Sequence, residues 1–158
     1  MGRNAAGVKG IDLASGDSVV GLVRCDEEAD LLTVTENGYG KRTALSEYLV
    51  QSEDGVRPQN RGGKGRLDIR TTDRNGLVVT VHAVKDEDDL MFISEQGMIV
   101  RVAAETVSRI GRATQGVRIV RLREGDRLIA AARVADGGRE EGDGAPETAG
   151  TERSDADQ

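Results

Sequence analysis

The stretch LLTVTENG at residues 31–38 recurs 59 positions later as LMFISEQG at residues 90–97. In the same register, Arg42 corresponds to Arg101. Each stretch is a short apolar run that ends in a turn containing glycine, and this pattern favours a strand and a hairpin over a helix. The recurrence therefore predicts an internal repeat built of β-strands.

A second motif follows the same repeat. The segments GRNAAGV at residues 2–8, NRGGKGR at residues 60–66 and GRATQGV at residues 111–117 each precede a short strand, a turn and an apolar strand. A unit of four strands and about 50 residues is typical of a propeller-like array. We therefore expect an all-β fold of about two and a half four-stranded blades. The expected strands are 19–24, 31–35, 41–44, 67–71, 77–84, 90–94, 99–103, 117–122 and 128–134.

The end of the chain differs from the rest. Residues 136–158 contain no Val, Ile, Leu or aromatic residue, and they carry eight acids against Arg139 and Arg153. Such a segment cannot bury enough apolar surface to offset its ordering entropy, so we expect a disordered acidic tail after a folded part at residues 1–135. The folded part then has no net charge, with 20 cations and 20 acids.

The composition excludes several kinds of site. The chain has one cysteine, Cys25, and one histidine, His82. A disulfide needs two cysteines and a structural zinc site about four ligands, so we expect no metal site, no cofactor and no catalytic residue. Cys25 is predicted to be a buried or half-buried packing residue and His82 an ordinary strand residue. The acidic run at residues 86–89 is predicted to be solvated.

The chain also lacks the signals of membrane proteins and exported proteins. No apolar run approaches the roughly 20 residues of a membrane span, and no apolar stretch follows the first residues. We expect a cytoplasmic, nucleoid-associated protein without a membrane partner. The 18 Arg against 4 Lys, beside 28 acids, indicate a salt-adapted host or a GC-rich genome.

Basic residues gather in two regions, residues 57–74 and 101–127, and each has a local net charge of +4. Cations that recur on one edge of each unit form a stripe that can neutralise phosphates, for which guanidinium groups are well suited. The alternative is that these arginines are solvated and paired with neighbouring carboxylates. The composition leaves both interpretations open.

The loop at residues 59–65 is the most specific candidate within these regions. Three glycines within four residues let the backbone approach an anion closely, and flanking cations and amides can bind phosphate. No Ser or Thr follows the lysine, which disfavours a nucleotide-binding loop. An ordinary glycine-rich connector is the alternative. The residues are Gln59, Asn60, Arg61, Gly62, Gly63, Lys64 and Gly65.

Several motifs together resemble the C-terminal domain of the DNA gyrase A subunit. QNRGGKG at residues 59–65 is similar to the QRRGGKG signature box of that family, and NGYGKRT at residues 37–43, TDRNG at residues 72–76 and GRATQGV at residues 111–117 are similar to its other motifs. The resemblance extends in order over residues 1–135. It implies a β-pinwheel, a relative of the six-bladed propeller, whose basic rim bends and wraps duplex DNA for negative supercoiling.

The resemblance also implies partners and a division of labour. The partners are duplex DNA, the gyrase B subunit and the remainder of the gyrase A subunit. The breakage-reunion region with its catalytic tyrosine is not in this chain, so we expect no enzyme activity from it alone; Tyr39 is interpreted as cross-strand packing. The predicted DNA-binding residues are the seven of the loop together with Arg66, Arg70, Arg74, Lys41, Arg42, Arg101 and Arg112.

Two departures from the family pattern leave alternatives open. Asn60 stands where the box has an arginine, and the motifs match the last blades, whereas the main box of the family lies in the first blade. The loop is therefore interpreted as a later, box-like loop. One alternative function is the C-terminal domain of a topoisomerase IV A-type subunit, and another is a protein-interaction propeller fragment without a DNA role.

Overall fold

The computed structural model describes residues 5–26 and 28–134. Within these ranges the chain forms antiparallel strands and two single-turn 3-10 helices, so the predicted all-β fold is confirmed. The predicted tail at residues 136–158 lies outside the described residues. None of the helices in the described ranges has the length and apolar character needed to cross a membrane. The elements are β1 (Asp30–Thr35), β2 (Tyr39–Ala44), η1 (Leu45–Tyr48), β3 (Leu49–Ser52), β4 (Gly55–Pro58), β5 (Val78–Val84), β6 (Asp89–Ser94), β7 (Ile99–Ala103), η2 (Ala104–Thr106), β8 (Val117–Arg118) and β9 (Leu128–Val134).

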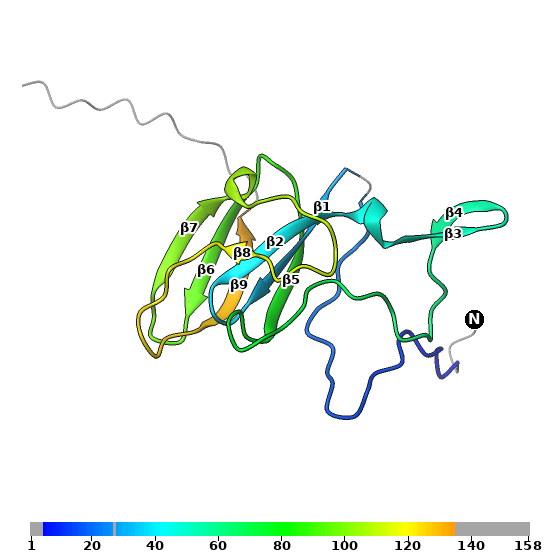
Figure 1. The fold of residues 1–158 in the computed structure, drawn as a ribbon, viewed down its shortest axis with the longest axis horizontal. Helices are drawn as coiled ribbons and strands as arrows, with labels where there is room; N and C mark the ends of the chain where they lie inside the picture. The colour runs from blue at the N-terminus through cyan, green and yellow to red at the C-terminus, as the bar shows by residue number, and fades with distance from the viewer. Residues whose placement is uncertain (1–4, 27, 135–158) are drawn as a thin grey trace, which may run out of the picture.

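The two larger sheets repeat one design (Figure 1). The first contains the order β5-β1-β2 and the second the order β9-β6-β7, and both carry a register shift at the same place, Val34/Thr35 and Ile93/Ser94. We call residues 30–84 the first unit and residues 89–134 the second unit. Strand β8 lies in the second unit in sequence but pairs with β2 of the first. The repeat predicted from the sequence is therefore present, and one exchanged strand connects its copies.

Glycines close both hairpins. Gly38 and Gly97 adopt φ values of +78° and +82° and donate their N–H groups to the carbonyls of Thr35 and Ser94. A side chain is strained in this left-handed region, so glycine is the favoured residue at both turns. At Gly38 a Cβ atom would also collide with the carbonyl oxygen of Val120.

The core lies between the two units. Leu32 and Val34 of β1 and Leu90 and Phe92 of β6 are fully buried in one cluster, together with Leu128 of β9. Strand alternation places these residues on the two sheet faces that meet, and burying each large side chain contributes about 1.5–3 kcal/mol. The packing of one unit on the other is therefore the main stabilising contact of the fold.

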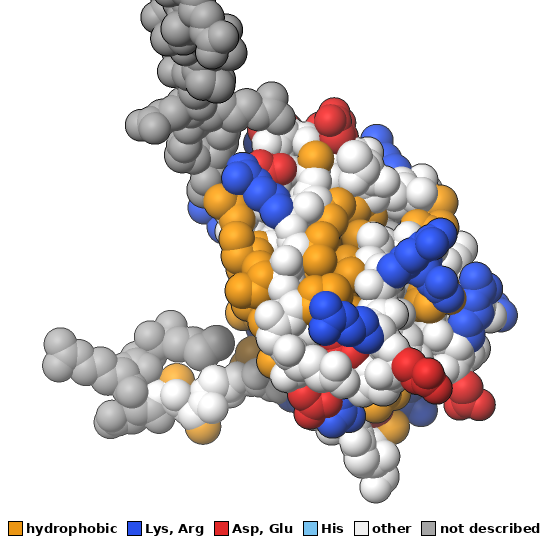
Figure 2. All heavy atoms as spheres, turned by 90° about the vertical axis from the view of Figure 1, so that its left-hand side faces the viewer, with side chains coloured by type: hydrophobic (Ala, Val, Ile, Leu, Met, Phe, Trp, Pro, Cys, Tyr) orange, Lys and Arg blue, Asp and Glu red, His pale blue; other side chains and the backbone are white. Residues whose placement is uncertain are grey.

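The opposite face of the second unit is open. Ile99 is 63% exposed, and Met91 and Ile93 are only partly buried. Figure 2 shows apolar side chains in bands across this side of the molecule, with charged side chains between and beside them. In the 59-residue repeat, Met91 and Ile93 correspond to Leu32 and Val34, which are fully buried. The same repeat position is thus core in one unit and surface in the other.

Three predicted strands are absent or shorter than expected. Residues 19–24 join no sheet among the described residues, and Val19 and Leu22 are 66% and 96% exposed. Residues 67–71 form only an isolated bridge between Ile69 and Thr114, and the strand predicted at 117–122 is reduced to two residues. The apolar pattern was correct, but a strand also needs a neighbour with which to form hydrogen bonds.

The hairpin β3–β4 was not predicted. It pairs Leu49 with Pro58 and closes at Ser52 and Gly55, where Gly55 adopts a φ of +114°. Asp54 and Gly55 form a dipeptide typical of tight hairpin turns, so the signal was present. It was missed because β4 is fully exposed and lacks the apolar alternation of a packed strand.

Candidate nucleic-acid interface

Pairing with carboxylates divides the cations of the structure into two groups. Of the 19 Lys and Arg in the described residues, eight lie within 4.0 Å of a carboxylate oxygen. A paired cation is locally neutralised, whereas an unpaired one remains available to an external anion. The paired cations are Lys9, Lys41, Arg42, Lys85, Arg101, Arg109, Arg127 and Arg133.

The unpaired cations are concentrated in two short segments. Residues 57–74 contain six and residues 112–123 contain four, and every Lys and Arg of these two segments is unpaired among the described residues. Residues 112–123 contain no acid at all. The ten residues are Arg57, Arg61, Lys64, Arg66, Arg70, Arg74, Arg112, Arg118, Arg121 and Arg123, and we call them the basic ribbon.

The two segments of the ribbon lie side by side. Ile69 and Thr114 form a parallel bridge, and the N–H of Arg70 donates to the Thr114 carbonyl at 2.8 Å. The fully buried Asn75 donates its side-chain amide to the carbonyls of Arg70, at 2.8 Å, and Gln115, at 2.9 Å. Segments about 45 residues apart in sequence are thereby joined where residues 69–75 meet residues 114 and 115. All ribbon residues are exposed except Arg112, which is half-buried.

Asp68 is the one half-buried acid in the two segments that carry the ribbon, and buried side chains of the first unit neutralise its charge. Asp68 accepts hydrogen bonds from Thr33 Oγ1 and Tyr48 Oη, both at 2.5 Å, and pairs with Lys41 Nζ at 2.9 Å. Burial, and then the hydrogen bond to Asp68, raise the pKa of Tyr48, so the phenol stays protonated as a donor. The Asp68 carboxylate is therefore not free to repel a phosphate.

Lys41 and Arg42 do not belong to the DNA-contacting set predicted from the sequence. The Lys41 side chain is fully buried and also donates to Thr43 Oγ1, at 2.9 Å, and to the Gly111 carbonyl, at 3.1 Å. Arg42 is 5% exposed; its Nε donates to the Val107 carbonyl at 2.9 Å, and its guanidinium pairs with Asp30 and Asp86. Buried cations cannot reach a phosphate, so we correct both assignments.

Arg101 is exposed but is not free. Its Nε donates to Asp89 Oδ2 at 2.9 Å, and its terminal nitrogen bonds to the same oxygen. The pair repeats that of Arg42 and Asp30 at the same positions of the first unit. Because its charge is offset, we leave Arg101 out of the ribbon.

The backbone of the box-like loop is held against residues 10–12 at two points. The Gly62 N–H donates to the Gly10 carbonyl at 2.7 Å, and the Gly63 carbonyl accepts from the Asp12 N–H at 2.8 Å. Gly62 and Gly65 adopt φ values of +81° and +77°, which requires glycine for the backbone shape. Arg61 and Lys64 of this loop are exposed, so their charges can be reached by a phosphate.

The other predicted residues divide by their partners. Gln59 is exposed, and Asn60 Oδ1 accepts a hydrogen bond from Arg57 at 2.9 Å. Arg66 donates to the Leu49 carbonyl at 2.7 Å and Arg112 to the Leu67 carbonyl at 3.3 Å. Exposed Arg70 makes no hydrogen bond through its side chain among the described residues. Of the three exposed cations in residues 66–74, Arg70 is therefore the one whose side chain has no hydrogen-bond partner among the described residues.

Four ribbon arginines were missing from the predicted set. Arg57 lies in strand β4 of the unpredicted hairpin, and Arg121 and Arg123 follow the shortened strand β8. Arg118 pairs with Tyr39 in the β2–β8 register and donates to its phenol oxygen at 2.8 Å. The high arginine content of residues 112–123 was a usable signal, but the pairing of Arg118 is visible only in the structure.

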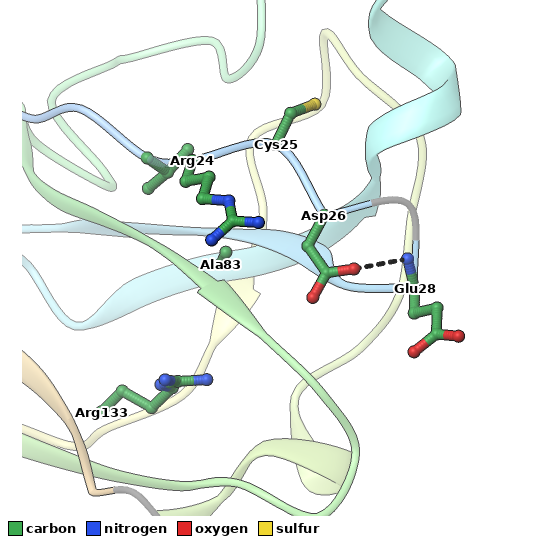
Figure 3. Close-up of a pocket in the computed structure, with 7 residues that line it drawn as sticks. Arg24, Cys25, Asp26, Glu28, Ala83 and Arg133 are labelled. Carbon is green, nitrogen blue, oxygen red and sulfur yellow. Dashed lines mark hydrogen bonds between the residues drawn. The ribbon is translucent and has the colours of Figure 1, made fainter.

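A hollow beside residues 23–28 carries charges of both signs (Figure 3). Arg24 and Arg133 line it together with Asp26 and Glu28. The Asp26 carboxylate accepts the Glu28 N–H at 3.1 Å, which lowers the pKa of Asp26. Arg133 pairs with Asp88 at 3.3 Å. Mixed charges give this hollow no preference for an anion, so we do not assign it to the interface.

The remaining candidates have structural explanations. Cys25 is exposed, so the prediction that it is buried or half-buried is wrong. His82 lies in β5 and donates from Nε2 to the Ala131 carbonyl of β9 at 2.7 Å, which ties the two units together. The carboxylates of Asp86, Asp88 and Asp89 are paired with arginines rather than only solvated. No group of three or more metal-ligating side chains is assembled in the described part of the chain.

Comparison with known proteins identifies the family. A family model described as DNA gyrase C-terminal domain, beta-propeller, matches residues 1–26, 29–85 and 88–135. The chain belongs to the DNA gyrase C-terminal domain family. The resemblance predicted from the motifs is thereby confirmed, and the matched residues include the whole basic ribbon.

Relatives with this domain are much longer proteins. The DNA gyrase A subunit of Staphylococcus epidermidis is 46% identical over 136 residues, which cover 85% of this chain and 14% of the relative. The DNA gyrase A subunit of Staphylococcus aureus strain MRSA252 is 43% identical over 143 residues, which cover 89% of this chain and 15% of the relative. The chain thus spans about one-seventh of the length of the gyrase A subunits that it matches.

Solved structures share the fold. A DNA gyrase A C-terminal domain superposes with a TM-score of 0.70 at 29% identity, over 82% of this chain and 41% of the other. The C-terminal domain of a DNA topoisomerase IV gives the same TM-score at 21% identity, over 82% of this chain and 38% of the other. The second likeness supports the fold alone.

Proposed function

We propose that this chain binds duplex DNA through its phosphates, without base specificity, as a DNA-bending part of a gyrase A subunit. The observation that carries the proposal is the basic ribbon, which places ten cations without carboxylate partners among the described residues on two adjoining segments. Each phosphate that a cation neutralises releases condensed counterions, and this release drives binding that does not depend on sequence. Arginine adds bidentate hydrogen bonds to the phosphate oxygens.

The aromatic residues favour duplex over single-stranded DNA. Tyr39 and Phe92 are buried, and Tyr48 is half-buried and bonded to Asp68. The sequence has no other aromatic residue. Binding of single strands relies on exposed aromatic platforms for base stacking, and this chain offers none in its described residues. Both tyrosines are engaged in hydrogen bonds, so we assign neither as a nucleophile.

The proposed setting is an ATP-dependent type II topoisomerase that introduces negative supercoils. In that setting the chain contributes a basic rim, and the gyrase B subunit together with the remainder of the A subunit would supply strand passage. Bending duplex DNA has an elastic cost of several kcal/mol, which only a continuous rim of contacts repays. Two units carry a short piece of such a rim, so we expect the chain to bind DNA more effectively than it bends it.

Two alternative functions differ in whether they predict binding to duplex DNA. A topoisomerase IV A-type subunit has the same fold, but the intact RGGKG at residues 61–65 favours gyrase. A protein-interaction module without a DNA role is favoured by the open apolar face of the second unit. The first predicts duplex binding as gyrase does, whereas the second predicts none.

A salt titration of duplex affinity tests the proposal. Arg61→Ala combined with Lys64→Ala should weaken binding to unrelated duplexes equally, and the slope of log affinity against log salt should fall by about 0.9 for each phosphate contact removed. The matched control is Arg101→Ala with Arg127→Ala, which removes the same charge from two exposed residues that are paired with carboxylates. If the wild-type chain shows no salt-dependent duplex binding, the DNA proposal fails and the protein-interaction alternative takes its place.

A further inference from the structure

Three side chains from separate segments meet at the first residue of β2. Tyr39 begins this strand, Arg118 lies in β8, and Arg74 lies in the turn before β5. Arg118 donates from a terminal nitrogen to the phenol oxygen at 2.8 Å, and Arg74 Nε donates to the same oxygen at 3.3 Å. One phenol oxygen therefore orients two guanidinium groups.

The aromatic ring adds a second restraint. The central carbons of the Arg74 and Arg118 guanidinium groups lie 5.0 and 5.2 Å from the Tyr39 ring centroid, within cation–π distance. Tyr39 is only 5% exposed, so its ring is held by the fold while both arginines reach the surface. The two donors, Arg74 first, lower the pKa of Tyr39, as expected for an oxygen that accepts from two cations.

The cluster carries two positive charges and no counterion. Neither arginine lies within 4.0 Å of a carboxylate among the described residues. Each guanidinium uses one nitrogen on the phenol and keeps further N–H donors free. Within residues 5–26 and 28–134, the one polar partner that the two arginines share is a phenol, which orients them without neutralising them. The group that complements this arrangement is an anion with several acceptor oxygens.

The turn that bears Arg74 is itself fixed. Asn37 Nδ2 donates to the carbonyls of Asp73, at 3.1 Å, and Arg74, at 3.3 Å. Asn75, fully buried, bonds the same turn to the Gln115 carbonyl at 2.9 Å, two residues before β8. The segments that carry Arg74 and Arg118 are therefore linked through Asn75, which reduces the conformational entropy that is lost on binding.

The second unit has no such cluster. In the 59-residue repeat, Met98 stands at the position of Tyr39. At the 51-residue step that relates residues 60–66 to residues 111–117, Gly125 stands at the position of Arg74. Neither residue can orient a guanidinium or carry a charge. The cluster is therefore a local feature of the first unit and is not required by the hairpin fold, which both units share.

We propose that Tyr39 is a positioning residue that holds Arg74 and Arg118 as a pair for the phosphodiester backbone of duplex DNA. This inference rests on the proposed function and names two of its contacts and the group that orients them. A fork of guanidinium N–H groups matches phosphate oxygens, and orienting the pair in advance strengthens binding without adding charge.

A double-mutant cycle separates positioning from charge. Arg74→Ala with Arg118→Ala should lower the salt slope by about 1.8, at about 0.9 for each contact. Tyr39→Phe keeps the ring and its packing but removes the phenol oxygen, and it should weaken duplex binding about threefold to tenfold. In the Arg74→Ala, Arg118→Ala background, Tyr39→Phe should change affinity by less than about 1.5-fold, because no arginine remains to be positioned.

Further variants protect the test from a folding defect. Circular dichroism and the urea midpoint check each variant, and Tyr39→Met introduces the residue that the second unit carries at this position. Arg74→Lys with Arg118→Lys keeps both charges, but a lysine ammonium lacks the planar set of N–H donors with which an arginine can bind the phenol and a phosphate at the same time. It should retain most of the salt slope and still lose affinity.

The outcomes distinguish this inference from the proposed function. If Arg61→Ala with Lys64→Ala lowers the salt slope while Arg74→Ala with Arg118→Ala leaves it unchanged, the DNA proposal stands, but the inference that Arg74 and Arg118 contact phosphates is wrong. If Tyr39→Phe weakens binding equally in both backgrounds, Tyr39 acts on the fold and not through the arginines. If the wild-type chain does not bind duplex DNA, both proposals are wrong.

Discussion

The two units place different chemistry on the same hairpin. Thr33, Lys41 and Thr43 of the first unit correspond to Phe92, Val100 and Val102 of the second. In the second unit this face packs into the apolar core. In the first unit this face is the more deeply buried of the two, since Thr33, Lys41 and Thr43 are at most 1% exposed whereas Val100 and Val102 are partly buried, but its side chains are polar.

The difference is explained by what covers each face. Thr33 bonds to Asp68, Thr43 Oγ1 donates to the Ile110 carbonyl at 2.8 Å, and Lys41 donates to the Gly111 carbonyl. These partners belong to or adjoin the two irregular segments that carry the basic ribbon. Irregular backbone has unpaired N–H and C=O groups that need hydrogen-bond partners when they are buried. The backbone groups of a sheet are already paired between its strands. The polar face therefore anchors the ribbon, and the apolar face anchors the other unit.

The largest expected effect tests the apolar side of this comparison. Phe92→Ala should reduce the free energy of unfolding by about 3–5 kcal/mol, because it removes a fully buried ring and leaves a cavity. Thr33→Ala at the matched position should cost less, about 1.5–2 kcal/mol, the contribution of its hydrogen bond to the Asp68 carboxylate. Urea unfolding measures both variants, and equal losses would contradict the assignment of the main core to the contact between the units.

A second pair of variants compares one ion pair in two environments. Arg42→Met should destabilise the fold by about 2 kcal/mol, because it breaks a buried pair and a hydrogen bond to Val107, although Asp30 keeps Arg109 at 2.9 Å. Arg101→Met should cost less than about 1 kcal/mol, since its pair with Asp89 is exposed. Methionine keeps most of the apolar stem at both sites, so the comparison isolates the charge. The comparison fails if the exposed site proves the more sensitive.

The smallest expected effect is a difference in acid sensitivity. At the 51-residue step that relates residues 60–66 to residues 111–117, Asp126 of the second unit stands where the first unit has Asn75. The polar Ser94 side chain, together with hydrogen bonds from the Gln96 and Arg127 N–H groups, lowers the pKa of Asp126. A carboxyl with a lowered pKa stabilises the fold above its unfolded pKa of about 3.9, and this contribution is lost as the pH falls further through the folded pKa.

Asp126→Asn should therefore reduce the loss of stability between pH 5 and pH 2 and make the second unit resemble the first. Urea midpoints measured across this range check the prediction. Asp17→Asn, at an exposed aspartate outside both units, is the control for the removal of one carboxylate. An identical profile for Asp126→Asn and wild type would mean that Asp126 is not responsible for the acid sensitivity.

Some features could be predicted from the sequence because they depend on neighbours in the chain. The hairpins at Asn37-Gly38 and Gln96-Gly97 follow from turn chemistry and short apolar runs, and the 59-residue repeat revealed two copies of one unit. The motif at residues 59–65 indicated the family. The prediction of a strand at residues 19–24 was wrong because the apolar pattern of these residues is a local property, whereas a strand also needs a neighbouring strand from elsewhere in the chain.

The tertiary structure alone decided which cations are free. Lys41 and Arg42 are adjacent and equally basic in the sequence, but both are buried against carboxylates that lie 27 and 44 residues further along the chain, Asp68 and Asp86. Arg118 looks like any other arginine until β8 crosses to the first unit and sets it beside Tyr39. Local sequence determines strand, turn and charge, whereas ion pairing and burial depend on segments that only the folded chain brings together.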